Sequence, residues 1–172
     1  RGGEVSYPRY PAYKPSGVPW LGEVPEHWEV WRLKYIAFLR NEKVYAQEVD
    51  EAYFGLENIE SGTARWIEGA SNGEAEGTAN VFKANDVLFG KLRPYLAKVH
   101  LCKADGIGST EFFVLRPEAA SPEFLVYLLL SSRFINLVDS STYGAKMPRA
   151  NWEFVSNIRW CVPPPAEQAA IA

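Results

Sequence analysis

Two short basic segments of the chain carry the side chains best suited to binding phosphate. The first, residues 89–99, reads FGKLRPYLAKV. Its candidate contact residues are Lys91, Arg93, Tyr95 and Lys98. Because a proline pushes the residue before it toward extended backbone, Arg93 is expected to be extended within a tight loop between two strands. Such a loop could hold phosphates or place Arg93 against a guanine edge. The alternative, which the spacing alone favours, is a solvated hairpin tip with Tyr95 packed inward.

The second basic segment, residues 142–151, reads TYGAKMPRAN. Its candidate contact residues are Tyr143, Lys146 and Arg149. Gly144 gives this segment backbone freedom. Arg149 stands just before an expected helix, whose N-terminus would itself favour a phosphate. The alternative is a connector whose Met147 fills the core, and the spacing leaves both interpretations open.

The sequence contains few residues or motifs that could perform catalysis. There is no G-x-G-x-x-G pattern, no Walker loop and no G-x-S-x-G elbow. The Glu-x-Lys element common in restriction nucleases and the [DNS]-PP-[YFW] tetrapeptide of adenine methyltransferases are also missing. Only His27 and His100 could serve acid–base chemistry at neutral pH, and His27 is expected to make a structural hydrogen bond. We therefore predict no catalytic residues.

A metal site is not expected either. His100 and Cys102 have a ligand-like spacing, but no second pair accompanies them. A structural zinc site needs about four ligands. Both residues are therefore interpreted as strand residues, and no metal ligand is assigned.

The net charge of the chain is −3, yet its charges are unevenly distributed. Residues 41–76 contain nine acidic and two basic residues, a net charge of −7. Residues 82–98 have a net charge of +3 and residues 141–160 one of +2. Local basic segments matter more for phosphate contact than the total charge. The acidic run is typical of a solvated face rather than a catalytic cluster, although Glu57 or Asn58 could contact a base.

Length and composition indicate one globular domain. A chain of 172 residues can bury a core without disulfides or a metal. Cys102 and Cys161 lie far apart, which indicates no disulfide framework and a reducing, cytoplasmic location. The longest apolar run, residues 124–130, is too short to span a bilayer, so no membrane association is expected. The N-terminal RGGEVSYPRYP lacks the apolar stretch of a signal peptide.

The apolar pattern predicts a mixed α+β domain in which strands precede helices. Strands are expected at residues 52–59, 87–89, 95–101, 110–115 and 158–162. Helices are expected at residues 122–130, 133–139 and 150–157, after a short helix, or a strand passing into one, at 31–39. Ser121 and Pro122 form the clearest helix start. Residues 7–28 are expected to form an arm on the domain surface and residues 71–80 an exposed loop. The prolines at 163–165 separate the domain from the helical pattern AEQAAIA.

Five segments, in order along the chain, resemble a type I restriction–modification specificity subunit (S subunit). They are SYPRYPAYKPSGVPWLGEVPEHWEVWRLKYIA, YFGLENIESG, NDVLFGKLRPYLAKV, STEFFVLRP and GAKMPRANWEFVSNIRWCVPPPAEQAAIA. No single segment is strong evidence, but five matches in the same order along the chain are specific. Together they cover nearly the whole chain.

The resemblance implies a target recognition domain, with a twisted, mostly antiparallel sheet and flanking helices. S subunits carry two such domains, each of which reads one half of a split DNA sequence. Long helices separate the two domains and hold the methyltransferase (modification) and restriction subunits. The recognition domain itself is non-catalytic in this family. S-adenosylmethionine belongs to the methyltransferase subunit, and ATP and magnesium to the restriction subunit, so this chain is expected to bind no cofactor.

The resemblance also suggests boundaries and contact residues. Residues 6–28 resemble the N-terminal half of an S subunit, so the chain is expected to be the first recognition domain. We expect an arm at 1–28, the recognition domain at 29–162 and the start of the spacer helix at 163–172. The base-reading residues of the family vary, so none is transferred by motif. Phosphate or groove contact is assigned to Lys91, Arg93, Lys146 and Arg149, and residues 71–80 are a candidate for reading bases.

The expected function is sequence-specific recognition of one half of a bipartite double-stranded DNA target, which directs methylation and restriction by the partner subunits. One alternative is a protein-interaction module of the same complex that uses its aromatic surface and does not touch DNA. Another is an enzyme, such as a nuclease or a methyltransferase, which the missing motifs disfavour. Salt dependence separates the first two, because DNA binding weakens steeply as salt rises.

Overall fold

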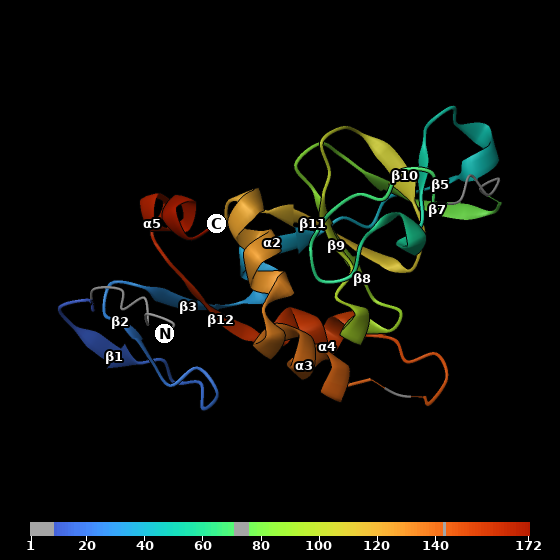
Figure 1. Ribbon diagram of the computed structural model, residues 1–172. Coiled ribbons are helices and arrows are strands. Elements are labelled where there is room, and N and C mark those ends of the chain that lie inside the picture. The colour runs from blue at the N-terminus through green and yellow to red at the C-terminus, as the bar shows by residue number, and fades with distance from the viewer. Residues whose placement is uncertain (1–8, 71–75, 143) are drawn as a thin grey trace, which may run out of the picture.

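The computed structural model describes residues 9–70, 76–142 and 144–172, and a four-stranded antiparallel sheet lies at its centre (Figure 1). In spatial order its strands are β4 (Ala37–Leu39), β11 (Phe112–Pro117), β8 (Val87–Gly90) and β9 (Val99–Leu101). Alternate side chains of a strand point to opposite faces of its sheet. Val87 and Phe89 enter one core cluster, whereas Leu88 between them enters another. The central sheet is therefore buried on both faces.

A second four-stranded sheet packs beside the first. Its order is β5 (Lys43–Tyr45), β7 (Thr78–Phe82), β10 (Gly106–Gly108) and β6 (Tyr53–Phe54), with 3₁₀ turns η1 (Ala46–Glu48) and η2 (Leu56–Asn58). Of these pairs, β10–β6 is parallel and the others are antiparallel. Phe82 packs with Leu88 of the central sheet. A Cβ on Gly106 would lie 2.6 Å from the Phe82 ring, so the close approach requires glycine there.

Residues from the two ends of the chain pair with each other. β1 (Tyr13–Pro15) and β2 (Glu23–Pro25) form a hairpin, and β3 (Glu29–Arg32) pairs antiparallel with β12 (Arg159–Val162). The short helix α1 (Leu33–Ile36) directly follows β3 and is continuous with β4. This confirms the expectation that residues 31–39 combine strand and helix.

Three further helices form in the regions where the sequence predicts helices, and the first begins at its predicted cap, Ser121. They are α2 (Pro122–Leu130), α3 (Ser132–Ser140) and α4 (Trp152–Asn157). The hydroxyl of Ser121 accepts a hydrogen bond from the Phe124 N–H (3.1 Å), and the amide oxygen of Asn151 accepts one from the Glu153 N–H (2.8 Å). Each cap satisfies a backbone donor that the first helical turn leaves unpaired.

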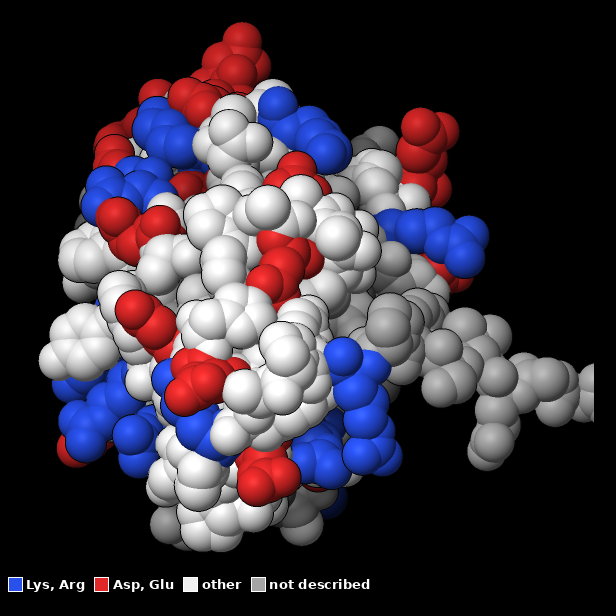
Figure 2. All heavy atoms as spheres, turned by 90° about the vertical axis from the view of Figure 1, so that its left-hand side faces the viewer, with Lys and Arg blue, Asp and Glu red and all other residues white. Residues whose placement is uncertain are grey.

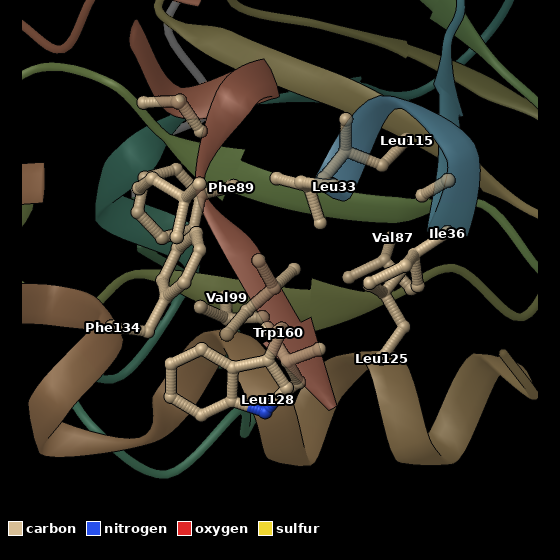
Figure 3. Packing of buried hydrophobic residues seen from close by; sticks show 14 of the residues in the cluster. Leu33, Ile36, Val87, Phe89, Val99, Leu115, Leu125, Leu128, Phe134 and Trp160 are labelled. Carbon is tan, nitrogen blue, oxygen red and sulfur yellow. The ribbon is translucent and has the colours of Figure 1, made fainter. Parts of the chain in front are cut away.

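The larger core cluster joins the central sheet, the helices and the β3–β12 pair (Figure 3). Leu125 and Leu128 of α2 are fully buried in it. The Phe134 ring of α3 meets Phe89 edge-on, with ring centroids 5.8 Å apart, and meets Trp160 of β12 at 6.0 Å. Because strands from both ends of the chain share one core with α2 and α3, the described residues form a single domain. The expected α+β fold, with a mostly antiparallel sheet and flanking helices, is confirmed.

Three sequence predictions differ from the structure. Residues 78–80, expected within an exposed loop, belong to β7, while 71–75 lie outside the described residues. The strand expected at 52–59 is the short β6 followed by a 3₁₀ turn, and the one expected at 95–101 starts only at Val99. Asn80 explains why residues 78–80 were expected in a loop. Its polar side chain is buried in β7, where its amide donates a hydrogen bond to the carbonyl of Phe112 (3.0 Å).

The N-terminal arm holds the last helix, α5 (Pro165–Ile171), through one carboxylate. Glu167, in the first turn of α5, accepts hydrogen bonds from the Tyr10 hydroxyl (2.7 Å) and the Trp28 indole N–H (2.7 Å). The third partner of this carboxylate is His27 Nε2, which confirms the structural hydrogen bond expected for His27. The donation by Tyr10, followed by that from His27, lowers the pKa of Glu167. Three arm residues therefore bind a single side chain of α5.

We predict that the attachment of α5 to the arm weakens in acid. Because the folded-state pKa of Glu167 is lowered from its ordinary value of 4.5, its contribution is fully present above that pH and is lost as the pH falls through the lowered pKa. The protection factors of the α5 amides, which compare observed with intrinsic exchange rates, should therefore fall in that range. In Glu167→Gln the amides should already exchange fast at neutral pH, without the acid step. If the α5 amides of this variant lost as much protection in acid as those of the wild-type chain, Glu167 would not be the group responsible.

Candidate nucleic-acid interface

The two basic segments lie side by side although they are far apart in the sequence. Leu92 and Arg149 form an isolated antiparallel β-bridge. The Arg93 N–H donates to the carbonyl of Pro148 (2.7 Å), and a second backbone hydrogen bond of 2.8 Å closes the other side of the bridge. The segments on either side of this bridge, residues 91–98 and 144–150, are called here the bridged basic loops.

Arg93 adopts left-handed backbone rather than the extended conformation that the sequence predicted. Its φ and ψ angles are 51° and 62°, and it leads into the 3₁₀ turn η3 (Pro94–Leu96). A following proline disfavours right-handed helical backbone, and Arg93 lies outside that region. The side chain is exposed, and its Nη2 donates to the carbonyl of Lys146 (3.3 Å). The arginine of one loop therefore lies over the backbone of the other.

Arg149 is held by Glu111, an acid that the sequence interpretation missed. Arg149 Nε and Nη2 donate to the Glu111 carboxylate over 2.9–3.1 Å, and this acceptor raises the pKa of the guanidinium. The backbone of Glu111 also accepts from the Lys91 N–H (2.8 Å), and Lys91 Nζ lies 5.8 Å from the centroid of the Phe113 ring. No local pattern links Glu111 to Arg149, because the contact depends on how β11 meets the loop before α4.

The other candidates divide between the surface and the interior. Tyr95 is 53% exposed, so the alternative with Tyr95 packed inward is wrong. Met147 is 50% exposed, which excludes a core-filling role. Lys98 is half-buried, and its amine donates to the carbonyl of Ile59 (2.7 Å), so it braces the loop instead of pointing outward. Tyr143 lies outside the described residues.

Two polar residues considered for base contact have structural roles. Asn58 is 6% exposed, and its amide oxygen accepts a hydrogen bond from the Gly55 N–H (2.8 Å). Asn80, in the segment proposed to read bases, is 8% exposed within β7. Neither side chain can reach a base edge from these positions. Glu57 is exposed, and its contact with a base stays a prediction.

Within residues 9–70, 76–142 and 144–172, no group of three or more His, Cys, Asp or Glu side chains could hold a metal ion. Burial raises the pKa of the Cys102 thiol to about 12, far from the thiolate that a metal would need. His100 lies in β9, and its Nδ1 is 3.0 Å from the carbonyl oxygen of Ala64.

In the same described ranges, no helix is long and apolar enough to cross a membrane.

The bridged basic loops differ in charge from the face that carries the N-terminal hairpin and α5. Figure 1 shows the loop before α4 projecting on the side away from β1, β2 and α5. On the face seen in Figure 2, Lys and Arg lie in the upper half and on both sides of the lower half, with Asp and Glu interspersed among them. Mixed signs of this kind do not favour a run of phosphates.

The left-handed backbone of Arg93 gives a test of the loop geometry. Left-handed backbone costs a side chain with a Cβ about 1 kcal/mol or more, and glycine almost nothing. We therefore expect Arg93→Gly to have a higher free energy of unfolding than Arg93→Ala, by about 1 kcal/mol in urea denaturation. Both variants lose the same guanidinium, so each controls for the other. Equal stabilities would mean that residue 93 is not held at positive φ.

Comparison with known proteins identifies the family. A family model described as type I restriction modification DNA specificity domain matches residues 25–172. The EcoDI specificity subunit, of a type I restriction enzyme from Escherichia coli, is 23% identical over 155 residues, which are 88% of this chain and 34% of that subunit. The chain thus spans about a third of the length of this curated relative.

Two solved structures have the same fold. The HsdS subunit from Thermoanaerobacter tengcongensis is 26% identical with a TM-score of 0.70, over 86% of this chain and 40% of that one. The type I restriction–modification S subunit from M. genitalium is 14% identical with a TM-score of 0.53, over 84% and 37% of the two chains. The relatives are specificity subunits, the non-catalytic components of their systems, as the sequence predicted. The chain belongs to the type I restriction–modification DNA specificity domain family and is a target recognition domain of a specificity subunit.

Proposed function

We propose that the chain recognises one half of a bipartite double-stranded DNA target through the bridged basic loops. The observation that carries this proposal is the β-bridge between Leu92 and Arg149, which brings together two cationic segments that the sequence singled out separately. Arg93 and Lys146 are exposed there and would contact phosphates, while polar neighbours would read base edges in the major groove. Family membership supports a role in DNA specificity.

In this proposal each loop residue has a defined part. Arg93 and Lys146 supply charge at the surface, and Arg149 supplies a guanidinium that is paired with the Glu111 carboxylate. Tyr95, exposed beside Arg93, is suited to donating a hydrogen bond from its hydroxyl to a phosphate oxygen. Because several groups are fixed by backbone pairing before DNA arrives, little side-chain and loop ordering remains to oppose binding.

The proposal also implies partner subunits, none of which is present in the structure. The methyltransferase and restriction subunits would act on DNA that this domain has recognised, and a second recognition domain would read the other half-site. Residues 163–172, which include α5, would begin the spacer helix toward that second domain. The chain would be the first of the two domains, because residues 6–28 resemble the N-terminal half of an S subunit.

The competing proposal is a protein-interaction module that does not contact DNA. The exposed aromatic side chains of α1 and β4 favour it, because exposed aromatic residues are common at protein interfaces. The two proposals differ in salt dependence. Phosphate contacts release counterions, so DNA affinity falls steeply with salt, whereas an apolar interface responds weakly.

The double variant Arg93→Glu/Arg149→Glu tests the DNA proposal. It reverses two charges at the bridge and should lower affinity for the cognate half-site by about 100-fold or more at moderate salt. Fluorescence anisotropy with a duplex that contains a methylated site, identified by sequencing DNA from cells with the full system, measures this. Lys43→Glu/Arg65→Glu makes the same change in charge within the acidic segment and should leave affinity within about threefold. Equal losses in both variants, or none, would refute the loops as the contact site.

Glu111→Gln tests the role of the carboxylate beside Arg149. The substitution keeps the shape of the side chain but removes the negative charge that pairs with the guanidinium. If Arg149 contacts a phosphate, affinity for duplex DNA should rise, and the slope of log K against log salt should steepen by about one. Glu118→Gln, which removes the carboxylate of the exposed pair with Arg116, is the matched control and should change neither quantity. Unchanged or weaker binding by Glu111→Gln would contradict the view that this carboxylate competes with phosphate for Arg149.

A further inference from the structure

Two arginines that face each other across the β3–β12 pair form no ion pair within the described residues, although Arg159 shares a surface pocket with Glu153. Arg32 and Arg159 are direct partners in the antiparallel register, and both are exposed. None of the ion pairs formed within residues 9–70, 76–142 and 144–172 includes either side chain. Like charges at directly opposite positions destabilise a strand pair. The fold therefore carries a cost here that an anionic partner would relieve.

The arginine pair lines a surface hollow with an aromatic wall. The hollow has a volume of about 700 Å³ and is lined by Val30, Trp31, Arg32, Tyr35 and Arg159. Tyr35 also lines a neighbouring hollow of about 470 Å³, which Lys34 and Phe38 share. Lys34 Nζ lies 5.3 Å from the centroid of the Tyr35 ring. None of the lining residues of these two hollows is acidic.

We propose that this basic aromatic face (Trp31, Arg32, Lys34, Tyr35, Phe38 and Arg159) docks a protein surface that presents carboxylates beside apolar side chains. Guanidinium forks bind carboxylates in bidentate geometry, and here two forks are available at one site. Trp, Tyr and Arg are also the residues that dominate binding energy at protein interfaces. The face therefore offers both the charge and the apolar area that such a partner needs.

The aromatic residues decide between a protein and DNA as the occupant. Trp31 is 39% exposed, Tyr35 59% and Phe38 54%. The phosphate edge of a duplex offers almost no apolar surface against which three rings could be buried, whereas a protein surface does. The position of the face agrees with this choice. Figure 1 shows β3 and β12 toward α5, and the loop before α4 on the opposite side of the molecule.

The proposal rests on the proposed function in one respect, the choice of the methyltransferase subunit as the probe. Purified methyltransferase subunit of the same system is titrated into the chain by calorimetry, and cognate duplex DNA is titrated separately. Arg32→Glu/Arg159→Glu should weaken binding of the subunit by about tenfold or more and leave DNA affinity within about twofold. Tyr35→Ser/Phe38→Ser should have the same pattern of effects without changing any charge.

The variant Arg93→Glu/Arg149→Glu serves as the reciprocal control, since it should lose DNA binding and keep the methyltransferase subunit. Far-UV circular dichroism and urea denaturation establish that each variant is folded. The docking proposal is overturned if the wild-type chain does not bind the subunit, if both face variants bind it normally, or if they lose DNA instead. The proposed DNA function fails by a different result, a wild-type chain that does not bind duplex DNA in a salt-dependent manner.

Discussion

The antiparallel pairing of β3 with β12 is the constraint on which the rest of the structure depends. It joins residues 29–32 to residues 159–162 and so closes nearly the whole chain into one domain. The pairing continues beyond the strands, because the Leu33 N–H donates to the Ile158 carbonyl (2.9 Å). Trp160 brings this pair into the main core, where its ring packs on those of Trp20 and Phe134. Separation of β12 from β3 would therefore remove part of the core as well as four cross-strand positions.

The same pairing relates the two proposed surfaces to each other. α4 lies between the bridged basic loops and β12, and α1 lies between β3 and β4, with α1 and α4 in contact. Trp152, at the start of α4, packs on Phe113 of β11 with ring centroids 5.3 Å apart, and it also lines the hollow beside Tyr35. The rings of Trp152 and Phe113 thus lie between the loops and the basic aromatic face, and Trp152 is in contact with both regions. Substitutions at one surface should leave the other intact, because the core between them does not depend on exposed side chains.

The sequence predicted those features that depend on short-range chemistry. Ser121 caps α2, as its position before Pro122 indicated, and residues 165–171 form a helix as their composition predicted. Features that depend on contacts distant in sequence could not be predicted. The left-handed backbone of Arg93 is fixed by its hydrogen bond to the Pro148 carbonyl, far along the chain. The burial of Asn80 depends on carbonyls of another strand, so its polar side chain falsely indicated a loop.

The pair of Glu111 with Arg149 suggests why a chain of net charge −3 can serve in DNA recognition. A bare cationic loop would bind any duplex, because phosphate contacts carry no sequence information. A carboxylate that already accepts from the guanidinium offsets part of this attraction, so Arg149 gains little from an arbitrary phosphate. In the proposed interface, contact would become favourable only where the correct bases allow the loops to approach closely enough for additional hydrogen bonds. The internal acid would then lower non-specific affinity more than specific affinity. It would thereby raise the ratio of specific to non-specific affinity, which decides occupancy when non-specific sites are in large excess.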